Sequence, residues 1–118
     1  MKDSRAITDA DRQKIVRLLE KTARTKILIS HGTYTMPITA RSIQKHLKRQ
    51  DQTIILMGSF IPLVGFSPSD APFSIGFSLA KVQELPAGVF ICMNGQIFTP
   101  DEAAKNIKLG RFYSLFEK

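Results

Sequence analysis

Three short apolar runs, separated by stretches long enough for helices, constrain the fold of this chain most strongly. Lys26–Ser30, Thr53–Met57 and Gly88–Met93 have the length of strands buried in a parallel sheet. Parallel strands need long crossovers, which are usually helices. The sequence therefore predicts one α/β domain over residues 1–118: three layers, with a mostly parallel sheet and helices on both faces, of the Rossmann or flavodoxin-like type.

Four amphipathic segments supply the expected helices. Thr8 is a predicted N-cap, and that helix runs to near Arg24 with one apolar face made of Ile15, Leu18, Leu19 and Thr22. Thr35 is expected to cap the next helix, which has Pro37 in its first turn, reaches about Arg49 and buries Ala40, Ile43 and Leu47.

The second half of the chain has equally clear signals. Asp70 is expected to begin a third helix, whose apolar face is Phe73, Phe77, Ala80 and Val82. Asn94-Gly95 predicts a two-residue hairpin into Gln96–Phe98. Thr99-Pro100-Asp101-Glu102 has the cap, proline and acidic residue of a helix start. The aromatic tail after Arg111 is expected to dock on the body or on another subunit.

The chain opens with a helix, whereas a doubly wound domain normally opens with a strand. We therefore expect the leading strand–helix unit of such a fold to be absent. The resulting free sheet edge favours pairing with another copy, so a homo-oligomer is expected.

The charge of +7 is concentrated in the first half of the chain. Residues 1–49 contain twelve Lys and Arg against four Asp and Glu, and the remaining residues contain five against six. Many of the basic residues occupy the polar positions of the first helix: Arg12, Lys14, Arg17, Lys21 and Arg24. A solvated helix face is the favoured interpretation over a nucleic-acid surface, because no aromatic residues alternate with these charges.

Other functions find little support in the composition. The longest apolar stretch, residues 53–66, is interrupted by glycine and proline and is too short to span a bilayer. Cys92 has no partner for a disulfide and is expected to be a buried residue in a reducing compartment, so we expect a cytoplasmic protein without a signal peptide. His31 and His46 are isolated, and neither a metal nor a cofactor is implied.

The polar loop after the first apolar run is the candidate site. Loops at the carboxyl ends of parallel strands are where ligands bind in open α/β sheets, and a following helix offers free backbone N–H groups. Gly32 and Thr33 lie at that point. From this loop alone, a simple connection between strand and helix is the commoner interpretation.

The segment Ile27–Met36 resembles the part of bacterial-type L-asparaginases in which a hydrophobic strand is followed by His-Gly-Thr-Asp-Thr-Met. Other segments are similar to family motifs in the same order: Ser4–Thr8, Met57–Pro62, Ser69–Phe73 and Gly88–Asn94, with Lys105 at the family's lysine position. The resemblance covers essentially the whole chain and is closest to a short, single-domain asparaginase-like form.

This resemblance implies amide hydrolysis through an acyl-enzyme, with a small amino-acid amide as substrate. It implies that Thr33 and Lys105 are catalytic, because a lysine whose pKa is lowered can activate the attacking group. It also implies that Ser4, Arg5, Gly32, Thr33 and Tyr34 form the substrate-binding set, in which Ser4 bonds the substrate's α-carboxylate.

Three departures from the family pattern lower the expected activity. The family's first nucleophile lies in a Thr-Gly-Gly-Thr-Ile segment that these residues do not contain. Tyr34 stands in place of the family's substrate-gripping Asp, and Ala6 in place of an acid; a neutral phenol cannot neutralise an ammonium group. We therefore expect an impaired amidohydrolase, with a non-catalytic member that binds an amino acid or acidic metabolite, or acts as an interaction subunit, as the alternative.

Overall fold

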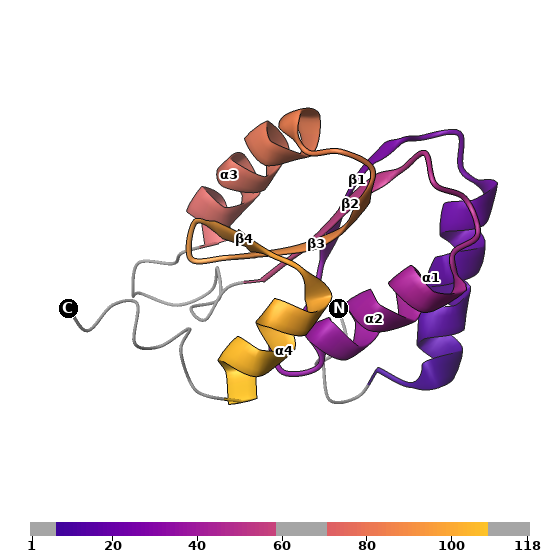
Figure 1. Ribbon diagram of the computed structural model, residues 1–118, viewed down its shortest axis with the longest axis horizontal. Coiled ribbons are helices and arrows are strands. Elements are labelled where there is room, and N and C mark those ends of the chain that lie inside the picture. Colours follow the sequence, from indigo (N-terminus) through magenta and orange to yellow (C-terminus); the bar gives the residue numbers. More distant parts are fainter. Residues whose placement is uncertain (1–6, 59–70, 109–118) are drawn as a thin grey trace.

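The computed structural model describes residues 7–58 and 71–108, and these residues form a three-layer α/β/α arrangement (Figure 1). The elements follow one another as expected from the sequence. In chain order they are α1 (Asp9–Lys21), β1 (Lys26–Ser30), α2 (Met36–His46), β2 (Thr53–Met57), α3 (Ala71–Glu84), β3 (Gly88–Met93), β4 (Gln96–Phe98) and α4 (Pro100–Lys108).

The sheet has the strand order β1-β2-β3-β4. β1, β2 and β3 are parallel, with Leu28 beside Ile55 and Ile55 beside Phe90 in the register. β4 is antiparallel to β3 through a tight turn in which Asn94 and Gly95 have φ angles of 52° and 69°. Positive φ at both central turn residues is what an Asn-Gly hairpin requires. The mostly parallel sheet and the hairpin are therefore confirmed.

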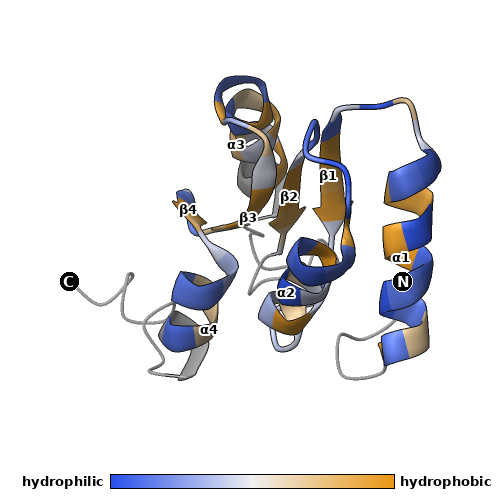
Figure 2. Ribbon diagram, turned by 45° about the vertical axis from the view of Figure 1, so that its right-hand side comes forward, coloured by the Kyte–Doolittle hydropathy of each residue, from blue (hydrophilic) through white to orange (hydrophobic). Residues whose placement is uncertain are grey.

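Helices cover both faces of the sheet, as predicted (Figure 2). α2 and α4 pack on one face, and α1 lies against α2 on the same side; α3 covers the other face. β2 is buried on both sides, since Ile54, Ile55 and Leu56 are fully inaccessible to solvent. Ile54 and Leu56 face the α2 side, while Ile55 faces the α3 side together with Cys92 and Val82.

Two helices begin with the capping box that the sequence predicts. At α1, the Asp11 N–H donates to the Thr8 hydroxyl at 3.2 Å, and the Thr8 N–H donates to the Asp11 carboxylate at 2.9 Å. At α4, Thr99 and Glu102 make the same exchange at 3.3 and 2.9 Å. The backbone hydrogen bond from Thr99 lowers the pKa of the Glu102 carboxyl group. These reciprocal bonds satisfy backbone donors that a helix start leaves unpaired.

α2 begins differently from the expectation. Thr35 is the N-cap residue, but its side chain makes no capping hydrogen bond, because its ψ of 11° departs from the extended conformation of ordinary N-caps. Pro37 lies in the first turn as predicted. The ends of two helices also differ: α1 stops at Lys21 and α2 at His46, a few residues before the predicted ends.

The buried face of α1 is rotated from the predicted one. Leu18 was expected in the core but is 69% exposed, while Arg12, expected in solvent, is only 6% exposed. Arg12, Val16 and Leu19 form the buried stripe at helical spacing. In α3, Val82 is buried and Phe77 half-buried as expected, but Ala80 is exposed because the stripe toward the sheet runs through Ser78 and Val82. Asp70 and the side chain of Phe73 lie outside the described residues.

Arg49 and Gln52 fasten the end of α1 to the start of β2. The Arg49 guanidinium forms a double hydrogen bond to Asp51 at 2.8 Å and donates through Nη1 to the Leu19 carbonyl at 3.0 Å. Gln52 Nε2 donates to the same carbonyl at 2.9 Å. Cations and donors at a helix C-terminus satisfy carbonyls that have no partner within the helix. These bonds set the position of α1 relative to the sheet.

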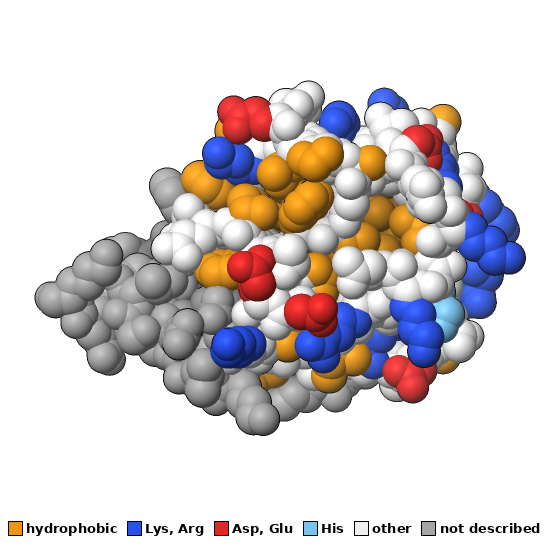
Figure 3. All heavy atoms as spheres, viewed as in Figure 1, with side chains coloured by type: hydrophobic (Ala, Val, Ile, Leu, Met, Phe, Trp, Pro, Cys, Tyr) orange, Lys and Arg blue, Asp and Glu red, His pale blue; other side chains and the backbone are white. Residues whose placement is uncertain are grey.

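The surface carries the charge distribution that the sequence indicates. Lys14, Arg17 and Lys21 are exposed on α1, and basic side chains gather on the α1 side of the molecule (Figure 3). The solvated basic face is thus confirmed for these three residues. No helix among the described residues is long and apolar enough to cross a membrane.

The chain passes very close to itself where β1 and β2 end. A Cβ atom built on Gly58 would lie 2.9 Å from the His31 carbonyl oxygen and 3.4 Å from the Met93 sulfur. The first of these contacts is with backbone, which cannot move aside as a flexible side chain can. Only glycine fits there without displacing the loop after β1.

Gly58→Ala should therefore lower the free energy of unfolding by about 1–3 kcal/mol. Gly76→Ala is the matched control, since a Cβ at Gly76 in α3 meets nothing within 4 Å. The control should raise stability by about 0.5–1 kcal/mol through helix propensity. Urea unfolding monitored by circular dichroism measures both; equal stability of Gly58→Ala and the wild type would contradict the close approach.

Candidate functional site

The loop His31–Thr35 connects β1 to α2 at the carboxyl edge of the sheet. The His31 N–H donates to the Met57 carbonyl at 3.0 Å, so the pairing of β1 with β2 continues one residue beyond the strand. The Met36 N–H donates to the Thr33 carbonyl at 3.4 Å, which closes the turn into α2. The side chain of Met36 is fully buried. The expected strand–loop–helix unit is therefore present, with its loop tied at both ends.

Solvent reaches four residues of this loop, Gly32 to Thr35, and His31 alone is buried. Gly32 and Thr33 are half-buried, whereas the Tyr34 side chain is 62% exposed. Among the described residues, the Thr33 hydroxyl has no recorded hydrogen-bond partner and can therefore meet a ligand. The predicted binding residues Gly32, Thr33 and Tyr34 are adjacent and accessible. Ser4 and Arg5, the other two, lie outside the described residues.

Lys105 lies on α4, which packs beside α2 (Figure 1). Its side chain is exposed. Within the described parts of the chain, no hydrogen bond joins Lys105 to Thr33. The two predicted catalytic residues thus come from neighbouring parts of the fold with no hydrogen bond between them, and their catalytic roles stay predictions.

A buried polar chain lies directly behind the loop. His31 is 5% exposed; its Nδ1 lies 2.7 Å from the Gly32 carbonyl oxygen, and its Nε2 lies 2.8 Å from the Thr39 hydroxyl. The Arg12 Nε–H donates to that same hydroxyl at 3.0 Å. The Arg12 guanidinium also pairs with Asp9, at 3.1 Å, where the Asp9 side chain is 93% exposed. Residues of α1, α2 and the loop are thereby joined.

The surroundings of His31 favour its neutral form. Burial is the largest cause that lowers the pKa of His31 below its ordinary value of 6.5, and the positive charge of Arg12 lowers it further. The hydrogen bond to the Gly32 carbonyl acts in the opposite direction and raises the pKa. The net shift is downward, so His31 is uncharged at neutral pH.

Sequence reasoning missed Arg12 and Thr39 as part of this site. Arg12 was assigned to the solvated face because charged side chains are seldom fully buried. A signal was present, since Arg12 precedes Val16 and Leu19 by four and seven residues and so shares their stripe. Thr39 carries no comparable signal, because a threonine in an amphipathic helix is ordinary.

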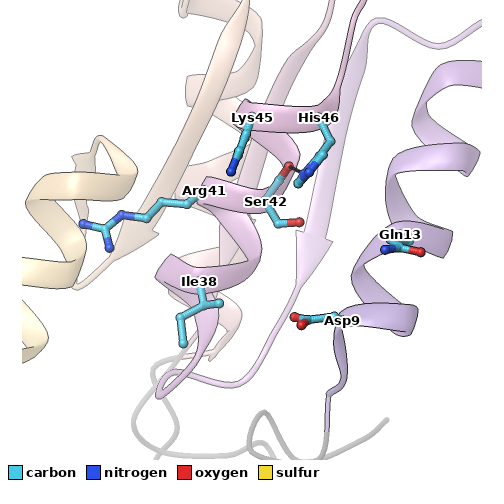
Figure 4. A pocket seen from close by; sticks show the side chains of 7 residues that line it. All are labelled: Asp9, Gln13, Ile38, Arg41, Ser42, Lys45 and His46. Atoms are coloured by element: carbon cyan, nitrogen blue, oxygen red, sulfur yellow. Dashed lines mark hydrogen bonds between the residues drawn. The ribbon is translucent and has the colours of Figure 1, made fainter.

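A groove lies between α1 and α2, on the solvent side of the hydrogen-bonded side chains of Arg12, Thr39 and His31 (Figure 4). It encloses about 320 Å³ and is lined by Asp9, Gln13, Ile38, Arg41, Ser42, Lys45 and His46. Some of its charges are already paired: Asp9 binds Arg12, and Arg41 points toward α4, where it binds Asp101 at 2.9 Å. His46 bonds the Ser42 carbonyl of its own helix at 3.0 Å.

The described residues contain neither a cluster of metal-ligating side chains nor an accessible thiol. No group of three or more His, Cys, Asp or Glu side chains there is arranged to bind a metal ion. Cys92 is buried, as expected, and burial raises the pKa of its thiol, which disfavours the reactive thiolate. The accessible Gly32–Tyr34 segment remains the candidate site.

Comparison with known protein families supports the resemblance noted in the sequence. A family model described as "Asparaginase, N-terminal" matches residues 1–111. A search of curated proteins returned no match. The family match covers nearly the whole chain, including the candidate loop, β3 and Lys105.

The lowered pKa of His31 makes stability depend on pH. The unfolded chain takes up a proton on His31 near pH 6.5, and the folded chain resists this, so folding is less favourable as the pH falls below that value. When the pH is lowered from about 7.5 to about 5.5, the urea concentration at the unfolding midpoint should decrease in the wild type and decrease less in His31→Gln.

His46→Gln is the control for this comparison, because His46 is exposed on α2 and is not part of the hydrogen-bonded set of Arg12, Thr39 and His31. It should keep the pH dependence of the wild type, whereas His31→Gln should be less stable at every pH but with a flatter profile. A profile that flattens in His46→Gln and not in His31→Gln would contradict the assignment to His31.

Proposed function

Since the chain belongs to the asparaginase N-terminal family, we propose that it is an asparaginase-like amidohydrolase domain that binds a small amino-acid amide. The observation that carries the proposal is the accessible Gly32–Tyr34 segment at the carboxyl edge of the sheet, before the first turn of α2. Ligands in open α/β sheets bind at this edge, and the start of a helix favours a carboxylate.

In this proposal the Thr33 hydroxyl contacts the reacting amide. A hydroxyl can orient the amide by hydrogen bonding or act as nucleophile if a base accepts its proton. Lys105 is the proposed base or positioning cation, supported by its place in the family-matched region and on a helix beside α2. Ser4 and Arg5 are the proposed contacts to the substrate's α-carboxylate end.

Tyr34 favours a second candidate function, which is binding of an amino acid or acidic metabolite without turnover. The family pattern has a carboxylate at this position, and the exposed Tyr34 phenol offers no negative charge to a substrate ammonium. We therefore propose that this chain hydrolyses asparagine weakly and binds it weakly. An acidic metabolite without an amino group would not incur this loss.

Self-association is part of the same proposal. Within the described residues β1 is an edge strand beside β2, and edge strands favour pairing with another chain. The oligomeric state, measured by light scattering, would test self-association.

A cytoplasmic, reducing location is supported by the lone, buried Cys92.

The experiment compares the wild type with Tyr34→Asp and its uncharged control Tyr34→Asn. Binding of L-asparagine and L-aspartate is measured by isothermal titration calorimetry, and ammonia release by a coupled assay. Tyr34→Asp should bind L-asparagine about tenfold or more tightly than Tyr34→Asn, since a charged hydrogen bond contributes about 1.5–3 kcal/mol.

Thr33→Ala, with Thr33→Ser as its control, tests the hydroxyl. The alanine variant should lose any ammonia release that the serine variant keeps. If neither the wild type nor Tyr34→Asp binds or hydrolyses these amino acids, the amidohydrolase proposal fails for this chain. Binding of an acidic metabolite without ammonia release would select the second candidate.

A further inference from the structure

With a neutral His31, the hydrogen bonds through Arg12, Thr39 and His31 allow one assignment of protons. Arg12 Nε–H can only donate, so the Thr39 oxygen must accept from it at 3.0 Å. The Gly32 carbonyl can only accept, so His31 Nδ1 must carry the hydrogen at their 2.7 Å contact. In the neutral imidazole Nε2 is then an acceptor, and the Thr39 hydroxyl hydrogen fills it at 2.8 Å.

Each of the three contacts then joins one donor to one acceptor. A charged imidazole would carry a hydrogen on Nε2 and direct it at the Thr39 oxygen, which also accepts from Arg12. The Thr39 hydroxyl hydrogen would then lose Nε2 as its acceptor, and inside the protein an unsatisfied polar group is costly. Within residues 7–58 and 71–108, the charged and polar groups that face His31 are Arg12 from α1, Thr39 from α2 and the Gly32 carbonyl, and Asp9 pairs with Arg12.

We propose that Arg12 and Thr39 are positioning residues that act through His31: they fix its imidazole in the neutral, Nδ1-protonated form, which holds the Gly32 carbonyl and so the backbone that presents Thr33. The identity of the ligand that the loop binds rests on the function proposed above. The positioning of the loop by His31 does not depend on that function.

The loop backbone supports this role. His31 N–H is bonded to β2, the Thr33 carbonyl accepts from Met36, and the His31 carbonyl lies against Gly58. The Gly32 carbonyl is a fourth point, and the His31 side chain holds it. These four contacts restrain the Gly32–Thr33 peptide and so the direction in which the loop presents the Thr33 side chain.

The imidazole reports its own protonation in ¹⁵N NMR, which gives a signature that packing alone would not produce. In the full wild-type chain we expect His31 Nδ1 with the shift of a protonated ring nitrogen and Nε2 with that of an unprotonated one. The His31 titration midpoint should lie below 6.5. The opposite tautomer, or a charged His31 at neutral pH, would overturn the proposal.

Thr39→Val removes the hydroxyl with little change of shape, and Thr39→Ser restores it. The valine variant removes the donor to Nε2, so it should shift the Nε2 signal of His31 and the backbone amide signals of Gly32 and Thr33, and the serine variant should return both toward the wild type. Thr25→Val makes the same chemical change at an exposed threonine before β1 and should leave His31 unchanged. Unchanged imidazole and loop signals in Thr39→Val would also overturn the proposal.

Arg12→Met keeps a long side chain while removing the charge and the Nε–H donor. It should raise the His31 titration midpoint toward 6.5, since Arg12 lowers the pKa through its charge. If Thr39→Val does not fold, the wild-type tautomer and the His31 titration in Arg12→Met still decide the proposal.

A ligand experiment separates this proposal from the proposed function. If the loop binds L-aspartate, Thr39→Val should weaken that binding about five- to tenfold, the effect of one hydrogen bond, and Thr39→Ser should restore it. Unchanged L-aspartate affinity in Thr39→Val would overturn the positioning role. The expected tautomer together with no amino-acid binding by any variant would support the positioning of the loop and refute the proposed function alone.

Discussion

The burial of β2 on both faces is the constraint from which the rest of the structure follows. Ile54, Ile55 and Leu56 are all fully buried, and the strand has hydrogen-bonded neighbours on either side. A strand in that position needs apolar helices above and below it, which α2 and α3 supply. Because its neighbours β1 and β3 run parallel to it, the loops that follow β1 and β2 come out at the same edge.

At that edge the packing leaves no room for a Cβ atom at position 58. Gly58 lies against the His31 backbone, and the His31 side chain turns back into the protein toward Thr39. The consequence is a division within one short loop. The His31 side chain points into the interior, while Thr33 and Tyr34 lie on the accessible side of the loop.

The polar chain behind the loop has a cost and a benefit. Burying Arg12 among apolar residues is unfavourable unless each of its donors has a partner, and a well-packed apolar replacement is often as stable. What the polar chain adds is directionality, because hydrogen bonds fix the orientation of a ring and a carbonyl in a way that apolar contacts do not. That is the property that a site presenting one hydroxyl in one direction requires.

The sequence by itself determined the order of elements, the bounds of all four strands, the Asn-Gly hairpin and the capping boxes of α1 and α4, because these depend on neighbouring residues within a few positions. It also determined the family, since Gly32, Thr33 and the matching segments are readable without coordinates. Only the tertiary structure decided that Arg12 is buried and Leu18 exposed, that Thr35 does not cap α2, and that Thr39 meets His31. These depend on how α1 lies against α2, which is decided by contacts between residues far apart in the chain, such as Arg49 with Leu19 and Arg12 with Thr39. Local propensity carries no information about such contacts, because each partner's preference is satisfied equally well in many orientations.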